Sequence, residues 1–247
     1  MSFEAEDALE KAARRGNLAE ARAVFDKYPN VNVNDADGNS QTPLFHAAEK
    51  GSMEVVMFLI GRGAFVSKVN KHNVSPMMVA AANGHARIAA ELCWRGANDQ
   101  RDAQNAWGET AVFAAAQGGH AHVITEFMPY FVDVDCPDDN GQTPLIAAAK
   151  NRHIQAAGVL IEACAMVNVQ DKKGYTALMH AVENRDEGMT RLLLAEHPKL
   201  DLKNNVEKTV LDIAPHGSEI RKLLESEKQF QAKIAAARGY PSCRPHP

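Results

Sequence analysis

Apolar and polar positions recur along this chain at a nearly fixed period. Each copy begins with a hydroxyl residue, continues through a short apolar run and reaches a pair of alanines, as in Thr143-Pro144-Leu145-Ile146-Ala147-Ala148-Ala149. The hydroxyl residue suits a helix N-cap, and proline suits the first helical position, where its missing N–H is not needed. The spacings between successive hydroxyl residues are 33, 35, 33, 33 and 33 residues for Thr42, Ser75, Thr110, Thr143, Thr176 and Thr209. A fixed period of this size predicts stacked supersecondary units rather than one globule.

Two further features complete each unit. A second apolar stripe with helical spacing follows a turn, as at Val55, Val56 and Leu59, and an extended piece such as 167–171 then leads into another turn. Glycine nine residues after the hydroxyl suits a left-handed helix end. The unit is thus a helix, a turn, a helix and a hairpin-like finger, which predicts an all-α solenoid of about seven units. The first and last repeats are degenerate, and in the first we expect Asp7 as the helix cap and Gly16 as the helix end.

One step of 35 residues draws attention to the stretch from Asp99 to Trp107. Two extra residues fall within it, and Asp99 occupies a position that is apolar in most other units, such as Val134 and Val167. We expect this finger to follow a different path from its neighbours. Trp107 at its tip either anchors a partner or folds back onto the altered finger.

The repeat pattern ends near residue 225, so we expect an array over 1–225 and an extension over 226–247. A helical stripe continues through Phe230 and Ile234, and a proline-containing tail follows. The extension either folds over the last repeat and shields its apolar face from water, or stays exposed and binds a partner.

Composition narrows the class of protein. The formal net charge of -4 argues against a general nucleic-acid binder, and long apolar runs typical of a membrane span are missing from the sequence. The four cysteines are widely spaced and form no CxxC pair, which indicates reduced thiols in the cytoplasm or nucleus. We expect a monomer.

No residue pattern indicates catalysis. His85, His120 and His153 share one repeat position, His46 and His180 share another, and neither set has the spacing of ligands on one helix face. The cysteines have no consistent nearby base, and glycine-rich phosphate loops are missing. The sequence therefore predicts no catalytic residue, metal, cofactor or small-molecule substrate, and no enzyme.

These motifs resemble ankyrin repeats. The resemblance rests on the 33-residue period, on Thr-Pro-Leu followed by paired alanines, on Gly84-His85 and Gly119-His120, and on Val-Asn-x-x-Asp in the finger, and it covers about residues 5–225. One departure is consistent, because the histidine that usually follows Thr-Pro-Leu is replaced. The residues at that position are Phe45, Met78, Phe113, Ile146, Met179 and Asp212. We expect apolar packing between units there instead.

The resemblance implies a protein–protein interaction module or adaptor that binds a protein through finger tips and the inner face of the first helices. Carried over by position, the partner-binding residues include Trp107, Lys71, His72, Asp139, Asn140, Lys172, Lys173 and Tyr175. In the altered finger we expect Arg101, Gln104 and Asn105 to lie beside Trp107 and to bind the partner with it. An assembly chaperone or inhibitor of a larger complex is the alternative, since the all-repeat architecture is similar to that of gankyrin-like proteasome chaperones. A nucleic-acid or acidic-surface binder is a weaker alternative, indicated only by Lys172-Lys173 and the basic tail.

Overall fold

The computed structural model describes residues 2–96, 101–130 and 132–237, and in these residues it contains helices and turns but no strand. The chain divides into two compact units, Met1–Met166 and Val167–Pro247. The all-α solenoid expected from the sequence is confirmed. Within the described residues, no helix is both long and apolar enough to cross a membrane.

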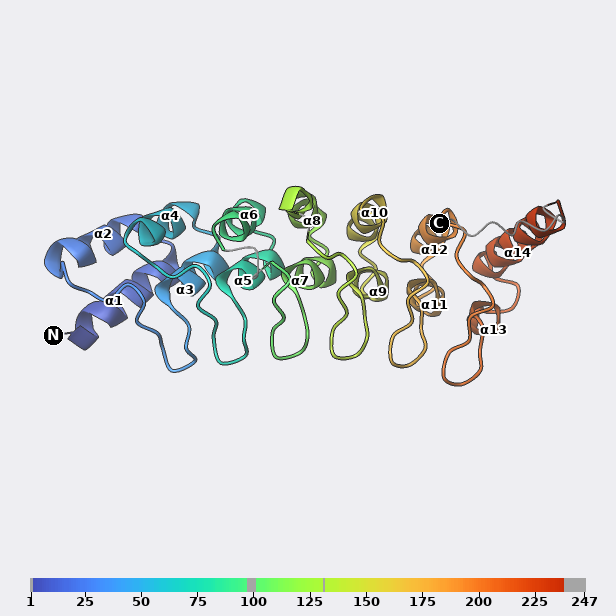
Figure 1. Cartoon of the computed structure of the whole chain (residues 1–247), viewed down its shortest axis with the longest axis horizontal. Helices are drawn as coiled ribbons and strands as arrows, with labels where there is room; N and C mark the ends of the chain where they lie inside the picture. Colours follow the sequence, from blue (N-terminus) through green and yellow to red (C-terminus); the bar gives the residue numbers. More distant parts are fainter. Residues whose placement is uncertain (1, 97–100, 131, 238–247) are drawn as a thin grey trace, which may run out of the picture. The chain divides into compact units, whose positions relative to one another are not determined.

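In its described residues the first unit contains five helix pairs and a short 3-10 helix. They are α1 (Ser2–Arg15), α2 (Leu18–Lys27), α3 (Pro43–Lys50), α4 (Met53–Gly61), α5 (Pro76–Ala82), α6 (Ala86–Arg95), α7 (Ala111–Gln117), α8 (Ala121–Phe127), η2 (Met128–Tyr130), α9 (Pro144–Lys150) and α10 (Ile154–Glu162). Figure 1 shows the odd-numbered helices of this unit in one row, the even-numbered helices in a second row, and the fingers along one edge.

The second unit contains two helix pairs. They are α11 (Ala177–Glu183), α12 (Glu187–Leu194), α13 (Val210–Ile213) and α14 (Glu219–Ala237). The last pair is unequal, because α13 has 4 residues and α14 has 19. Helix α14 runs without a break through residue 225, where we expected the array to end.

The start of each first helix follows from its sequence. In five repeats the side chain of the hydroxyl residue accepts a hydrogen bond from the backbone N–H three residues later, at distances of 3.1 to 3.4 Å. The residue that donates this N–H takes the place of the usual histidine, and its side chain is at most 3% exposed at Phe45, Met78, Phe113, Ile146 and Met179. The expected apolar packing is confirmed there. Asp212 differs, since it is exposed and its carboxylate accepts hydrogen bonds from Thr209.

Alanine pairs let the first helices pack closely. Ala47 and Ala48 in α3 are fully buried, as are the equivalent alanines of α5, α7 and α9 within about 1%. Within the first unit each first helix contacts the next first helix, and each second helix contacts the next second helix. Every pair thus buries its apolar faces against its neighbours, which is how a repeat array obtains a continuous core.

Helices α3, α5, α7, α9 and α11 are each followed by a residue in the left-handed conformation that suits a helix end. Gly51, Gly84 and Gly119 have φ angles of 83°, 77° and 76°, and Arg152 and Arg185 keep this conformation without glycine, at 64° and 56°. A second reason for glycine was missed, because a Cβ on Gly51 would lie 2.3 Å from the ring of His85 in the next pair. That ring donates through Nε2 to the carbonyl oxygen of Glu49 at 3.0 Å.

The first pair begins earlier than expected. Asp7 lies inside α1, where it pairs with Lys11 at 2.7 Å, so its predicted role as a helix cap is wrong. Gly16 has a φ of 68°, which confirms it as the end of this helix.

Candidate functional site

The finger tips share one construction. In each finger an Asp or Asn stands five residues before the hydroxyl residue, and its side-chain oxygen accepts hydrogen bonds from two backbone N–H groups of the tip. The residues that do this are Asp37, Asn70, Asn105, Asp138, Asp171 and Asn204. These residues fix the backbone of the tips. The signal was present in the sequence, since all six residues are in register, but we did not use it.

Neighbouring tips of the first unit are hydrogen-bonded to one another through their backbones. The bonds run from Lys71 N–H to Asn39 O at 3.1 Å, from Ala106 N–H to His72 O at 2.8 Å, and from Asp139 N–H to Trp107 O at 2.9 Å. Four consecutive tips therefore lie side by side, and the structure brings Lys71, His72, Trp107, Asp139 and Asn140 together on one edge of the first unit.

Trp107 reaches across to the preceding finger. Its ring stacks on the ring of His72, with centroids 5.2 Å apart and planes inclined by 27°. The side chain remains 50% exposed. The neighbouring tip approaches closely because the next residue is Gly108, with a φ of 76°, where a Cβ would lie 2.7 Å from the backbone nitrogen of Asp139. Trp107 therefore does not fold back onto its own finger; it lies half-exposed on a rigid pair of tips.

The side chains of Gln104 and Asn105 form hydrogen bonds within and between the fingers. Asn105 holds the tip turn and also donates to Glu109 at 2.8 Å. Gln104 donates to the carbonyl oxygens of Gly108 at 2.7 Å and Pro137 at 2.9 Å, so it joins its finger to the next one. The side-chain nitrogens of both residues and the Asn105 oxygen are thus hydrogen-bonded within the fingers, which fixes the tip that carries Trp107.

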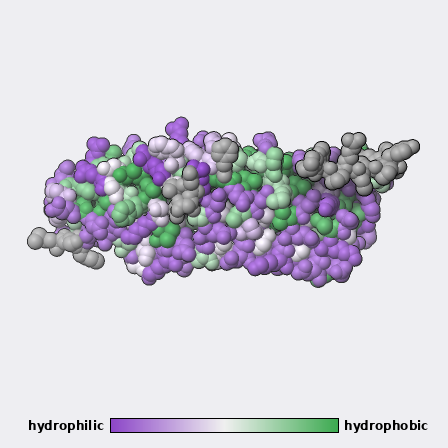
Figure 2. Space-filling view, in the orientation of Figure 1, coloured by the Kyte–Doolittle hydropathy of each residue, from purple (hydrophilic) through white to green (hydrophobic). Residues whose placement is uncertain are grey.

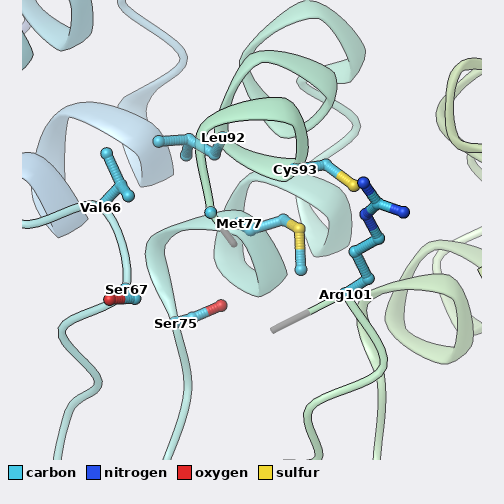
Figure 3. A pocket seen from close by; sticks show the side chains of 8 residues that line it. Val66, Ser67, Ser75, Met77, Leu92, Cys93 and Arg101 are labelled. Carbon is cyan, nitrogen blue, oxygen red and sulfur yellow. The ribbon is translucent and has the colours of Figure 1, made fainter. Parts of the chain in front are cut away.

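Arg101 does not lie beside Trp107, in contrast to our expectation. Figure 3 shows its side chain running toward Cys93 of α6 and not toward the finger tip. The guanidinium donates to the carbonyl oxygen of Tyr130 at 2.8 Å. It borders a cavity of about 10 Å³, which is room for no more than one water molecule. Arg101 thus belongs to the packing behind the finger.

The two extra residues also lie away from the tip. Asp102 accepts a hydrogen bond from the N–H of Asp133, as Asp135 does from Met166, and both stand eight residues before their hydroxyl residue. The register is therefore regular from Asp102 onward, so our expectation of an altered finger path is wrong for the tip. The additional length precedes Asp102, and Asp99 lies outside the described residues.

The other predicted site residues lie in the second unit, which is described by itself. Lys172 and Lys173 are exposed on a finger tip whose carbonyl oxygens accept hydrogen bonds from Asn205. Tyr175 is half-buried, with its hydroxyl 3.4 Å from Glu183 and its ring 5.0 Å from that of His180. Burial and the carboxylate of Glu183 raise the pKa of the Tyr175 hydroxyl.

Figure 2 shows what kind of surface the fingers offer. The finger edge is mostly hydrophilic, and hydrophobic surface gathers nearer the helices. On such an edge a half-exposed tryptophan is unusual. Trp94, at 64% exposure, is exposed on α6, and Arg95 lies over its ring at 5.4 Å.

The thiols lie in different environments. Cys93 is buried and its pKa is raised by that burial, whereas Cys136 is half-buried and Cys164 is exposed. Cys243 lies outside the described residues. Because a thiol is activated by a lowered pKa, Cys93 is poorly suited to act as a nucleophile.

The sequence matches models of a known protein family. The sequence model "Ankyrin repeats (3 copies)" matches residues 9–102 and 92–171, and the model "Ankyrin repeat" matches residues 173–205. Ankyrin repeats are protein–protein interaction modules without catalytic chemistry of their own.

Individual relatives cover only part of the chain. Probable E3 ubiquitin-protein ligase XBOS32 of Oryza sativa subsp. japonica is 32% identical over 126 residues, which are 49% of this chain and 25% of that protein. Probable 26S proteasome regulatory subunit p28 of Saccharomyces cerevisiae is 29% identical over 127 residues, which are 51% of this chain and 55% of that protein. This chain thus spans about a quarter of the length of the plant ligase and about half of the yeast protein.

Solved structures agree on the fold. The human ASB11 ankyrin repeat domain aligns with a TM-score of 0.77 at 24% identity, over 89% of this chain and 96% of that one. The ankyrin repeat domain of Bcl-3 aligns with a TM-score of 0.76 at 23% identity, over 88% and 97%. The family matches extend over most of the helix pairs described above. The chain belongs to the ankyrin repeat family.

Proposed function

We propose that this protein is a non-catalytic adaptor that binds a protein partner through the adjacent finger tips of its first unit, with Trp107 as the anchor. The observation that carries the proposal is the half-exposed Trp107 ring stacked on His72 of the neighbouring finger. Tryptophan is enriched among the residues that dominate binding energy at protein interfaces.

The stack supports binding in a second way. A side chain that is already held in one orientation loses little conformational entropy when a partner covers it. Trp107 is held by the His72 ring, by the turn that Asn105 forms, and by the hydrogen bond from the next tip to its carbonyl oxygen. Its exposed ring face is thus presented in a preformed position.

Polar residues surround this anchor. Lys71, Asp139 and Asn140 are exposed on the flanking tips, where they would form the polar rim of an interface. We propose Lys172, Lys173 and Tyr175 as further partner-binding residues on the finger of the second unit. The protein acts as a monomer in the cytoplasm or nucleus under this proposal, and it requires no cofactor.

A comparison of two tryptophan variants tests the proposal. Wild-type protein, Trp107→Ala and Trp94→Ala are used as baits in parallel, and the bound proteins are identified by mass spectrometry. Trp94→Ala is the matched control, because it removes an even more exposed tryptophan from a helix instead of a finger. We expect a partner that wild type and Trp94→Ala retain and Trp107→Ala loses. A partner that all three baits retain would place the binding surface elsewhere.

An assembly chaperone or inhibitor of a larger complex is the second candidate. The similarity to the proteasome regulatory subunit p28 over half of this chain supports it. This candidate predicts that the partner is a subunit that binds when free and is released from the finished complex. Equal binding of the free subunit and the finished complex would favour a stable adaptor instead.

A further inference from the structure

Three potential metal ligands meet where the first two helix pairs join. Glu10 lies on α1, Asp37 on the first finger and His46 on α3, and one ligand atom from each lies within 4.8 Å of the others. The sequence did not indicate this cluster, because its members come from different positions in two neighbouring repeats.

The buried imidazole of His46 lacks a hydrogen-bond partner. His46 is 1% exposed, and neither ring nitrogen makes a hydrogen bond in the structure. The nearest polar atoms are carboxylate oxygens, with Asp37 at 3.3 Å from Nε2 and Glu49 at 3.6 Å from Nδ1. A neutral imidazole has one N–H and can donate to only one of these carboxylates, so its second nitrogen would face a carboxylate oxygen with its lone pair unless a metal ion lay between them.

Arg14 shows that the two carboxylates attract a cation. Its guanidinium donates to Glu10 at 2.7 Å and to Asp37 at 3.0 Å. The Arg14 side chain is 47% exposed, so it can swing into solvent without unpacking the helices. Arginine has only donors, and it does not satisfy His46 in this arrangement.

We propose that Glu10, Asp37 and His46 bind one first-row divalent metal ion, with Zn²⁺ as the favoured ion, in place of Arg14. One imidazole and two carboxylates suit Zn²⁺, and a water molecule would complete four-coordination. The three carboxylates Glu10, Asp37 and Glu49 outnumber the single cation Arg14, so a divalent ion balances their charge. The bound ion would fasten the degenerate first helix pair to the second pair.

The second unit contains an internal control. His180 occupies the repeat position of His46, and its Nε2 lies 3.0 Å from Asp171, the counterpart of Asp37. The nearby Glu183 is hydrogen-bonded to Tyr175. Among the described residues, only the cluster in the first unit unites three suitable ligands. Substituting His180 should therefore leave metal binding unchanged.

Asp37→Asn separates metal binding from folding. The Oδ1 atom of Asp37 holds the finger turn, whereas Oδ2 faces Arg14 and His46. Asparagine performs the same turn role at Asn70, so the finger should be retained. The new amide can donate to His46 but cannot replace the carboxylate ligand.

The test is a titration of the full-length, chelator-treated protein with Zn²⁺ by isothermal calorimetry, with Co²⁺ absorption as a second readout and Mg²⁺ as a control ion. We expect one Zn²⁺ per chain, a raised melting temperature, and binding at least tenfold weaker in Asp37→Asn and Glu10→Gln. Arg14→Ala should bind at least tenfold more tightly, because it removes the competing cation. His180→Ala should bind as wild type does.

Two results would overturn the proposal. One is that neither wild type nor Arg14→Ala binds Zn²⁺, which would show that the cluster is not a metal site. The other is that Glu10→Gln and Asp37→Asn bind Zn²⁺ as wild type does, which would place the ion at other residues.

Discussion

Glycine residues at the ends of the first helices have two roles, a backbone role and a packing role. Gly51 has a φ of 83°, and a side chain there would collide with the His85 ring. We expect Gly51→Ala to lower the free energy of unfolding by about 2 kcal/mol, because the left-handed conformation alone costs an alanine about 1–2 kcal/mol. Chemical denaturation measures the change.

Gly158 provides the matched control for this substitution. It lies inside α10, and an added Cβ would meet no atom within 4 Å. Gly158→Ala should stabilise the protein by about 0.5–1 kcal/mol, because alanine is the better helix former. Effects of the same sign in both variants would refute the packing role of Gly51.

Asp135 illustrates a charge that opposes folding. Burial raises the pKa of this carboxyl, and the nearby Asp133 raises it further, although a hydrogen bond from the Met166 N–H acts in the opposite direction. Because the pKa is higher in the folded state, stability falls as the pH rises from the unfolded value of about 3.9 through the folded one. At neutral pH the whole penalty is present.

We therefore expect Asp135→Asn to be more stable than wild type at pH 7, by less than about 1 kcal/mol because solvent screens the charge. Asn34 and Asn168 accept the equivalent backbone hydrogen bond in their own repeats, so we expect the variant to keep this bond. Thermal unfolding at pH 7 and pH 3 measures the effect. A gain of equal size at pH 3 would show that ionisation is not its cause.

At the scale of elements, the finger tip depends on one side chain. Asn105 accepts hydrogen bonds from the N–H groups of Trp107 and Glu109. Asn105→Ala should cost about 1–2 kcal/mol, since it removes three hydrogen bonds from a half-buried turn, two from backbone N–H groups and one to Glu109. Asn105→Asp should cost less, because an aspartate keeps both backbone hydrogen bonds, as Asp138 does in the next tip, although it loses the donor to Glu109. Equal losses in both variants, measured by urea denaturation, would contradict this role.

The last helix covers the end of the second unit. In α14, Ile220 and Leu224 are buried, Glu227 pairs with His197 at 2.9 Å, and the Phe230 ring stacks on His197 at 5.4 Å. Deleting residues 226–247 should therefore lower the melting temperature and promote aggregation, because a terminal repeat needs a cover. An unchanged melting curve would favour the alternative, in which the 46% exposed Phe230 serves a partner.

For the whole molecule, the repeat made most of the fold predictable. The hydroxyl caps, the left-handed helix ends and the apolar residues in place of histidine each follow from one unit and recur in the others. Asp7 was wrongly taken as a cap because α1 begins before it, at Ser2. Helix α1 also packs against α3, a contact that no local sequence pattern reports.

The candidate site was less predictable, because it depends on contacts between neighbouring repeats. Sequence position identified Trp107 and His72 as tip residues but could not show that their rings stack. Arg101 is close to Trp107 in sequence and still packs behind the finger. The cluster of Glu10, Asp37 and His46 was not predicted for the same reason, since side chains from two neighbouring repeats of the first unit form it.

The most direct test of the central claim is the affinity of Trp107→Ala for a partner recovered with the wild-type protein, measured together with its melting temperature. We expect affinity to fall by about 2 kcal/mol or more, roughly 30-fold, as for an interface hot spot, with the melting temperature unchanged. Trp94→Ala should bind as wild type does. Normal binding by Trp107→Ala, or unfolding of this variant, would contradict the account and make Trp107 a structural residue.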